Sequence, residues 1–325
     1  MRRTLVTALA TLTLTLAFSV NVLAQAKPWP NSQIRMLIGY SPGGAADIIA
    51  RIYADAMGKH LGQNIVVDNR PGAGSTLSSQ LIVSAAPDGY TIGLGTATIY
   101  GIDQYLYKVK YTPADLTPIT QLTTAPMILA VNKSLGVSTI AEFVAYAKAN
   151  PGKLNYSSSG TGGSPHTVAT MFERAVGVEM THVPFKGGAP ALFAVAQGDV
   201  HFSFGTAPSV LPMGRKGLVR MLGVSSEKRS AIAPDLPTLI EGGLPGLSDS
   251  FWFGLFAPAN LPKEIADKLY AAAIKASNDP QVRERLLGSG NEVATSASPA
   301  AFHSFALVDG KQSKERIEAA KIRPD

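Results

Sequence analysis

The sequence predicts an α/β protein of two lobes, and three observations support this fold class. Apolar runs of strand length alternate with amphipathic stretches of helical period, and Gly- and Pro-rich turns separate them. This alternation occurs once before and once after about residue 126. Such a pattern is typical of parallel sheets covered by helices. The 325 residues suffice for two lobes, each with its own core.

The first lobe begins with a buried strand at 34–40, which Ser41-Pro42-Gly43-Gly44 interrupts. A helix at 45–60 follows, because its apolar residues recur with a helical period, and Gly62 ends it. A strand at 65–67, a helix at 75–85 and a strand at 91–97 continue the alternation.

The second lobe repeats the pattern. We expect strands at 126–131, 154–158, 180–184, 200–204 and 219–225, and helices at 139–149, 165–176 and 189–197. An apolar strand at 251–257 and helices at 262–277, 280–287 and 299–321 close the chain. That strand needs cover on both faces, so we expect the closing helices to return to the first lobe. The predicted bounds are 27–127 with 250–325 for lobe 1, and 128–249 for lobe 2.

Residues 1–26 resemble a secretory signal peptide. Arg2 and Arg3 precede an apolar stretch from Leu5 to Val22, and small residues up to Ala26 fit a cleavage site. A membrane anchor of similar length is the alternative, but threonines weaken the stretch and no basic stop-transfer cluster follows it. We therefore expect an exported protein.

Composition excludes several classes of chemistry. With no cysteine, thiol nucleophiles, disulfides, iron–sulfur clusters and Cys-ligated zinc are excluded. The net charge of +6 falls to about +4 once Arg2 and Arg3 leave with the leader, and the remaining basic residues are scattered. Nucleic-acid binding requires a basic stripe with aromatic residues, so we expect no nucleic-acid partner. The five histidines share no metal-ligand spacing, and we expect neither a metal nor a cofactor.

Two Gly-rich loops, each between a strand and a helix, are the candidate ligand-binding segments. The first runs from Tyr40 to Asp47 and the second from Tyr156 to His166. Glycine lets the backbone approach a ligand closely, and the first N–H groups of a helix have no partner within the helix. A helix N-terminus suits a carboxylate or phosphate without any basic side chain. The alternative is that both loops are only turns between a strand and a helix, although the second loop has more hydroxyl groups than helix capping requires.

Enzyme motifs are mostly absent. The chain has no G-x-S-x-G, P-loop, H-E-x-x-H or G-x-G-x-x-G pattern. His166 could act as a base for one of the serines at 157–159, which would make an exported serine hydrolase, but a structural hydrogen bond is the simpler interpretation. Asp47 lies four residues before Arg51, so it forms either a helical ion pair or a contact with a ligand. Tyr40, Phe185 and Trp252 line either the core or the cleft.

The chain also resembles a known family, the substrate-binding proteins of tripartite tricarboxylate transporters, called Bug receptors. The resemblance rests on segments that occur in the same order over the whole mature chain: Pro42-Gly43-Gly44-x-x-Asp47-x-x-Ala50-Arg51, Asn69-Arg70-Pro71-Gly72-Ala73-Gly74, Pro87-Asp88-Gly89-Tyr90-Thr91, Ser158-Ser159-Gly160-x-Gly162-x-x-x-His166, Val183-Pro184-Phe185-Lys186-Gly187-Gly188-x-Pro190-Ala191 and Trp252-x-Gly254-Leu255-x-Ala257-Pro258.

This resemblance implies a periplasmic binding protein of the type II fold, with a ligand cleft between two lobes joined by two strands. It implies a receptor without enzyme activity that passes a carboxylated solute to the permease subunits of a tripartite transporter. We expect a monomer. Together with the loops, the resemblance gives the expected ligand-binding residues: Tyr40, Gly43, Gly44, Ala45, Ala46, Asp47, Thr96, Ser158, Ser159, Gly160, Thr161, Gly162, Ser164, His166, Phe185 and Thr206.

Ligand identity stays open at this point. Phe185 stands where tyrosine is common in the family, and Ser75 stands where glycine is common, so the family's ligands cannot be carried over. A dicarboxylate, a tricarboxylate, an acidic amino acid and an aromatic acid all fit. A receptor that passes its ligand-bound state to a signalling partner is the other alternative, since the same closed lobes could contact either partner.

Overall fold

The computed structural model describes residues 28–107, 109–319 and 322–323. The predicted signal peptide, residues 1–26, lies outside the described residues. Within the described part of the chain, no helix is long and apolar enough to cross a membrane.

One ten-stranded sheet runs through the molecule, and its strand order is β2-β1-β3-β9-β4-β7-β5-β6, with β8 and β10 also paired to β4. Strands β1 to β3 are parallel to one another, as are β5, β6 and β7, whereas β4 and β9 run antiparallel to their neighbours. The strands are β1 Ile34–Ile38, β2 Ile65–Asn69, β3 Thr91–Gly95, β4 Leu116–Val131, β5 Asn155–Ser158, β6 Thr181–Pro184, β7 Phe202–Thr206, β8 Arg220–Val224, β9 Ser250–Pro258 and β10 Glu292–Val293.

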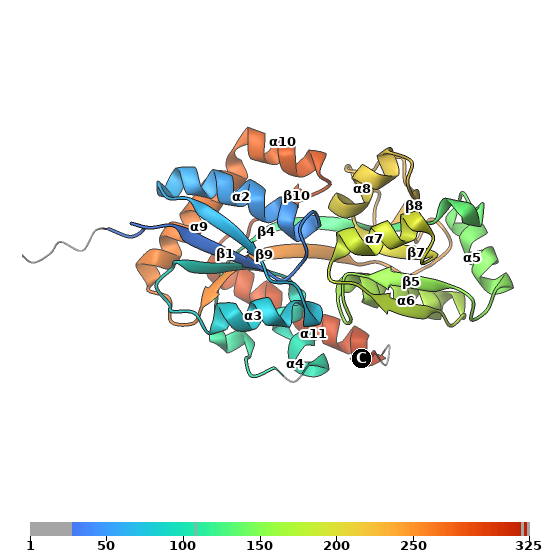
Figure 1. Ribbon diagram of the computed structural model, residues 1–325, viewed down its shortest axis with the longest axis horizontal. Coiled ribbons are helices and arrows are strands. Elements are labelled where there is room, and N and C mark those ends of the chain that lie inside the picture. The colour runs from blue at the N-terminus through green and yellow to red at the C-terminus, as the bar shows by residue number, and fades with distance from the viewer. Residues whose placement is uncertain (1–27, 108, 320–321, 324–325) are drawn as a thin grey trace, which may run out of the picture.

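The sheet has two halves, and β4 and β9 connect them (Figure 1). Strand β4 pairs with β9 as far as Pro126, and from Met127 onward it pairs with β7 and β8. The helices of the first half are α2 Ala45–Leu61, α3 Thr76–Val83, α4 Ile102–Leu106, α9 Lys263–Asn278, α10 Pro280–Gly288 and α11 Pro299–Ala319. Those of the second half are α5 Ile140–Ala149, α6 Ser164–Val176, α7 Gly188–Gln197 and α8 Ala207–Arg215.

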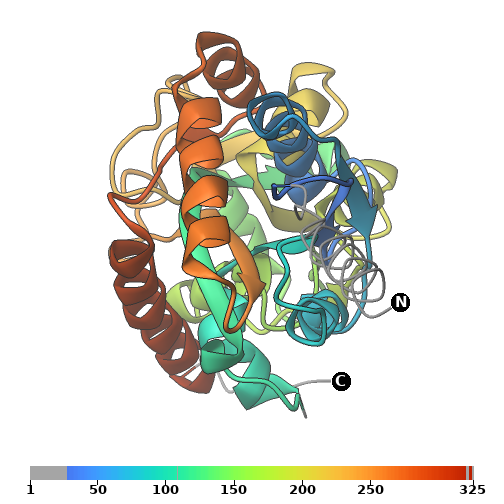
Figure 2. The same ribbon diagram turned by 90° about the vertical axis from the view of Figure 1, so that its left-hand side faces the viewer.

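The three closing helices pack on elements of the first half. Helices α9 and α10 contact α2, and α11 contacts β4, α4 and the short 3-10 helix η2 (Ala97–Tyr100). Figure 2 faces the end of this half, where α9 crosses in front of the sheet. The exact lobe bounds of 27–127 with 250–325, and 128–249, stay a prediction.

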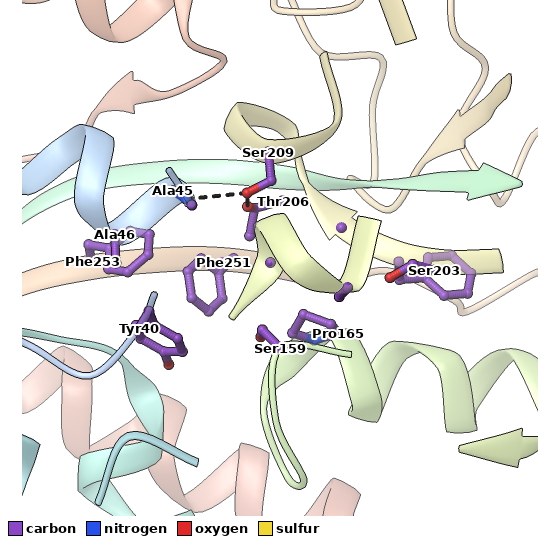
Figure 3. A pocket seen from close by; sticks show the side chains of 15 residues that line it. Tyr40, Ala45, Ala46, Ser159, Pro165, Ser203, Thr206, Ser209, Phe251 and Phe253 are labelled. Carbon is purple, nitrogen blue, oxygen red and sulfur yellow. Dashed lines mark hydrogen bonds between the residues drawn. The ribbon is translucent and has the colours of Figure 1, made fainter. Parts of the chain in front are cut away.

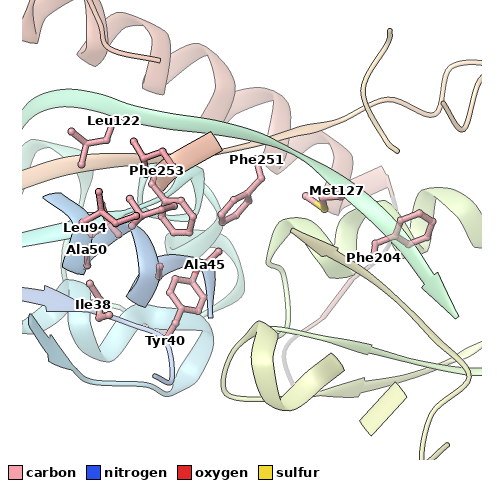
Figure 4. Close-up of a cluster of buried hydrophobic side chains, with 14 of the residues drawn as sticks. Ile38, Tyr40, Ala45, Ala50, Leu94, Leu122, Met127, Phe204, Phe251 and Phe253 are labelled. Carbon is pink, nitrogen blue, oxygen red and sulfur yellow. The ribbon is translucent and has the colours of Figure 1, made fainter. Parts of the chain in front are cut away.

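The largest buried apolar cluster extends across both halves, which differs from the expectation of one core for each lobe. Ile38 and Leu94 belong to it in the first half, Phe204 belongs to it in the second, and Met127 and Phe251 lie where the two connecting strands pass from one half to the other (Figure 4). A separate, smaller cluster around Leu192 and Val210 fills the space beneath α7 and α8. The connecting strands therefore pack against apolar side chains in both halves of the molecule.

Local patterns predicted most elements well, but they missed the first part of β4, the helices α8 and α4, and the two-residue strand β10. Strand β4 has 16 residues, of which the sequence predicted only the last six. Its first ten residues contain one proline and four threonines, and register shifts interrupt their pairing with β9. Helix α8 was missed because Pro208 and Pro212 both lie in it, the second in its interior. Helix α4 has only five residues, too few for a visible period.

Candidate functional site

The two predicted loops meet at a small cavity between the halves of the molecule. This first cavity has a volume of about 30 Å³. Four helices begin at its wall: α2 at Gly44 and Ala45, α6 at Pro165, α7 at Gly188 and α8 at Thr206 (Figure 3). Each helix N-terminus carries roughly half a positive elementary charge. The wall therefore favours an anion although none of its lining residues is Lys or Arg.

The start of α2 shows how backbone groups become available to a ligand. Gly44 is the N-cap and has no side chain to accept from the first turn. The Ala45 N–H donates across the cleft to Oγ of Ser209, at 3.2 Å, and the first helical bond runs from the Ile48 N–H to the Gly44 carbonyl. The first turn thus directs its donors outward to the opposite lobe, where an acid group could also accept them.

Asp47 holds this loop in place. Its carboxylate accepts from the Gly43 N–H at 3.0 Å, from Asn69 Nδ2 at 3.1 Å and from the Arg51 guanidinium at 2.9 Å. Burial would raise the pKa of Asp47, but the bonds from Arg51, Gly43 and Asn69 outweigh it and hold that pKa below its usual value. The helical ion pair with Arg51 is present. Asp47 does not line the first cavity, so the geometry favours a role in bracing the loop.

The second loop is held by a serine and two histidines. The Ser158 hydroxyl contacts Nε2 of His182 at 2.7 Å and accepts from the Gly160 N–H at 3.2 Å. Nδ1 of His166 accepts from the Gly162 N–H at 3.1 Å, and the two imidazole rings stack with centroids 3.6 Å apart. Burial, with a smaller contribution from His182, lowers the pKa of His166 to about 3. His166 is therefore neutral at physiological pH and acts as an acceptor for the loop backbone.

This geometry does not favour Ser157 or Ser158 as the nucleophile of a serine hydrolase with His166 as its base. Ser158 pairs with His182 rather than with His166, and its side chain is fully buried. The Ser157 hydroxyl donates to the carbonyl of Ala191 at 2.8 Å. These serine hydroxyls have structural partners, whereas a nucleophile must face its substrate. Among the described residues, no group of three or more His, Cys, Asp or Glu side chains could hold a metal ion.

A second, larger cavity of about 390 Å³ adjoins the first. Ser159 lines both cavities. Tyr40 lines the first cavity, and its hydroxyl makes hydrogen bonds with Thr96 and with Ser75, which lines the second. Burial raises the pKa of Tyr40, while the bonds to Thr96 and Ser75 oppose that rise. Tyr40 thus stays neutral and forms part of the wall of the first cavity.

The structure places the sixteen expected residues in three groups. Those that line the first cavity are Tyr40, Gly44, Ala45, Ala46, Ser159 and Thr206. Those that line the second are Gly160, Thr161 and Phe185, again with Ser159. Those that lie behind the walls are Gly43, Asp47, Thr96, Ser158, Gly162, Ser164 and His166. The last group contains the residues that hold the two loops, which sequence motifs do not distinguish from contact residues.

Several wall residues were missed by sequence reasoning. The first cavity is also lined by Ser209, Phe251 and Phe253, and the second by Tyr107 and Lys186. Ser209 could have been found from the sequence. Thr206-Ala207-Pro208 follows a predicted strand, and proline is frequent at the first position of a helix, so the segment indicates a third loop that begins a helix. The other residues lie on segments whose approach to the cleft depends on the tertiary fold.

Direct hydrogen bonds close the cleft. The Ser41 N–H donates to the Lys186 carbonyl at 3.0 Å, and the Ser41 hydroxyl donates to the same carbonyl at 2.5 Å. At the wall of the second cavity, the Tyr107 hydroxyl donates to the Thr161 carbonyl at 2.7 Å. Together with the bond from Ala45 to Ser209, these contacts describe a closed conformation in which the two loops face one another.

Comparisons with known proteins place the chain among binding proteins. The family model described as "Tripartite tricarboxylate transporter family receptor" matches residues 49–321. A curated relative, the UPF0065 protein in the gbd 5′ region of Cupriavidus necator, is 39% identical over 264 residues, which cover 81% of this chain and 80% of the relative.

Solved structures of similar proteins extend over nearly the whole chain. The R. palustris protein Rpa4515, solved with adipate, gives a TM-score of 0.88 at 31% identity and covers 91% of this chain and 100% of its own. The periplasmic binding protein BugD gives 0.87 at 31% identity with the same coverage. MatC of Rhodopseudomonas palustris, solved with malate, gives 0.84 at 31% identity and covers 89% of this chain and 100% of its own.

These likenesses confirm the predicted fold, which is the two-lobed type II periplasmic binding protein fold with its cleft between the lobes. The family resemblance found in the loop motifs is also confirmed. The chain belongs to the family of tripartite tricarboxylate transporter receptors, the Bug family of periplasmic binding proteins.

Proposed function

We propose that this chain is a periplasmic receptor without enzyme activity that captures a small carboxylated solute between its lobes. The main support for this proposal is that four helix N-termini lie at the wall of the first cavity, which contains no basic side chain. Such a wall stabilises a carboxylate through backbone N–H groups and hydroxyls. The relatives solved with adipate and malate support a dicarboxylate as the first class to test.

Capture is coupled to closure of the lobes. A ligand held against α2 in one lobe and against α7 and α8 in the other favours the closed conformation, which the bonds from Ser41 to Lys186 and from Tyr107 to Thr161 also stabilise. In this proposal the expected ligand residues act in two ways: those on the cavity walls contact the solute, and those behind the walls hold the loops.

Export and delivery complete the proposal. Residues 1–26 would direct the chain to the periplasm and be removed, and the closed monomer would then pass its solute to the permease subunits of a tripartite transporter. N-terminal sequencing of the protein recovered from the periplasm tests the cleavage. A mature chain that still begins at Met1 would contradict it.

The binding test uses the mature chain and a panel of acids: malate, adipate, citrate, glutamate and benzoate. At a concentration of 100 Kd, a ligand that binds only the folded chain stabilises it by about 2.7 kcal/mol. For a domain of this size we expect the Tm to rise by about 5–10 °C. The dimethyl esters of malate and adipate are the matched neutral controls. If no acid raises the Tm, or if the esters raise it equally, the proposal is wrong.

A further inference from the structure

The second cavity has the properties of a site for an anionic group. Twelve residues line it, and Lys186 is the only one of these described residues that carries a charge. The Lys186 side chain is exposed and takes part in none of the ion pairs found among the described residues. Hydroxyl groups of Ser75, Ser159 and Thr161 contribute to the same wall. An unpaired cation and several hydroxyls suit a carboxylate.

The two cavities differ in size, and a ligand that extends from one into the other would have most of its volume in the larger one. The first cavity, at about 30 Å³, is much the smaller of the two, so we place only one end of the ligand there. The second cavity, at about 390 Å³, has room for the rest of the molecule, and Ser159 borders both. One end of an acid at the four helix N-termini would therefore place the other end near Lys186.

One segment of the wall of the second cavity, residues 72–75, has an unusual backbone conformation. Residues 72–75 all have positive φ, with values of 142°, 45°, 62° and 83°, although Ala73 and Ser75 are not glycines. Such a conformation is strained for a residue with a Cβ, and strain of this kind is concentrated at functional sites. All four residues line the second cavity. A Cβ on Gly160 would lie 3.3 Å from the Gly74 Cα, so this strained turn and the second loop meet at the cavity wall.

Lys186 is also fixed in position by closure. Its carbonyl accepts both hydrogen bonds from Ser41 on the opposite lobe. The lysine backbone is therefore held beside the cavity when the lobes are closed. Its side chain takes no part in these bonds, so it can be replaced without loss of the contacts that close the cleft.

We propose that the second cavity is a second anion subsite and that Lys186 makes the receptor selective for acids with two anionic groups. This inference rests on the proposed function, because it assigns the distal end of the same ligand. One carboxylate binds at the N-termini of α2, α6, α7 and α8, and the other binds in the second cavity with Lys186 and the hydroxyls of Ser75, Ser159 and Thr161.

The test compares diacids with half-esters of the same length. Titration calorimetry measures the Kd of adipate, malate and the monomethyl ester of each for the mature wild-type chain and for Lys186→Met, Lys186→Arg and Lys153→Met. Lys153 is the matched control, because it is exposed and precedes β5 at the end of the strand opposite the second loop.

The expected result is specific to charge. Lys186→Met should weaken diacid binding by about tenfold, between the effect of an exposed ion pair and that of a buried charge-assisted hydrogen bond. It should leave the Kd of the half-esters unchanged, Lys186→Arg should retain most of the diacid affinity, and Lys153→Met should have no effect.

Two outcomes would overturn the inference while leaving the proposed function intact. Wild-type protein could bind the half-ester as tightly as the diacid, or Lys186→Met could preserve the ratio of their affinities. If the wild-type chain binds none of these acids, the proposed function itself fails. The far-ultraviolet circular dichroism and the Tm of each variant without ligand show whether a change in affinity comes from a change in the fold.

Discussion

Gly162 lies where the second loop meets the opposite lobe, and Gly162→Ala should weaken binding while leaving the chain folded. A Cβ at this position would lie 2.1 Å from Cδ1 of Leu106 and 3.1 Å from Cγ2 of Ile102, both on α4. Because α4 belongs to the other half of the molecule, this contact forms only when the lobes are closed. The substitution therefore raises the free energy of the closed state relative to the open state.

Two free-energy costs contribute to the effect of Gly162→Ala, and they can be separated. Gly162 has φ +79°, and a left-handed conformation costs an alanine roughly 1–2 kcal/mol in the open and closed states alike. Overpacking against Leu106 costs about 1–3 kcal/mol more, in the closed state alone. Since 1.4 kcal/mol is a factor of ten in an equilibrium constant, the ligand affinity should fall by about five- to 150-fold.

Gly177→Ala is the matched control. Gly177 ends α6 in the same half of the molecule, has φ +73°, and its added Cβ would meet nothing within 4 Å. Both variants should lose about 2–8 °C in Tm without ligand, as the backbone cost predicts. Titration calorimetry with adipate and malate should then show weaker binding for Gly162→Ala alone. Equal affinity in both variants would mean that closure does not bring Leu106 against Gly162, and the reasoning would be wrong.

Three further predictions follow from contacts in the structure. Tyr107→Phe removes the bond between the lobes to the Thr161 carbonyl, so calorimetry should find affinity lowered by about two- to tenfold. Arg316→Ala leaves the buried Asp249 without its cation, which costs about 3 kcal/mol, or about 6–12 °C in Tm. Burial raises the pKa of Asp249 to about 6 even with Arg316 opposing it, so the loss should be larger at pH 8 than at pH 5. The pKa of His166 is about 3 when folded and about 6.5 when unfolded, so stability should fall as the pH drops from 6.5 to 3, and His166→Asn should flatten that decline in denaturant titrations.

Each of these predictions has an outcome that contradicts it, and the first two also have a control variant. Tyr105→Phe changes an exposed tyrosine on α4, just before Tyr107, and should leave affinity unchanged, so an equal effect in both variants would exclude a role for the bond between the lobes. Lys311→Ala, on an exposed position of α11, should barely change the Tm, and a similar loss there would exclude the Asp249 pair as the cause. An unchanged acid slope in His166→Asn would show that other groups control acid stability.

The sequence predicted the helices that have clear local signals. Helix α2 was expected at 45–60 and spans Ala45–Leu61, and α6 was expected at 165–176 and spans Ser164–Val176. Both end at a glycine in the left-handed conformation, Gly62 and Gly177. Such a glycine marks the end of a helix and can be recognised in the sequence without knowledge of the tertiary fold. The first half of β4 carried no such signal, because its length comes from pairing with β9, which lies more than a hundred residues away.

The sequence by itself determined the fold class, the family and the two loops that begin helices, since glycines, hydroxyls and apolar periods are local properties. Only the tertiary structure decided which residues of those loops face a cavity and which hold it. Ser209, Tyr107 and Lys186 reach the cleft from other elements, and their contacts join residues 54 to 164 positions apart. Such contacts exist because the two connecting strands bring the lobes face to face, and no local pattern records that approach.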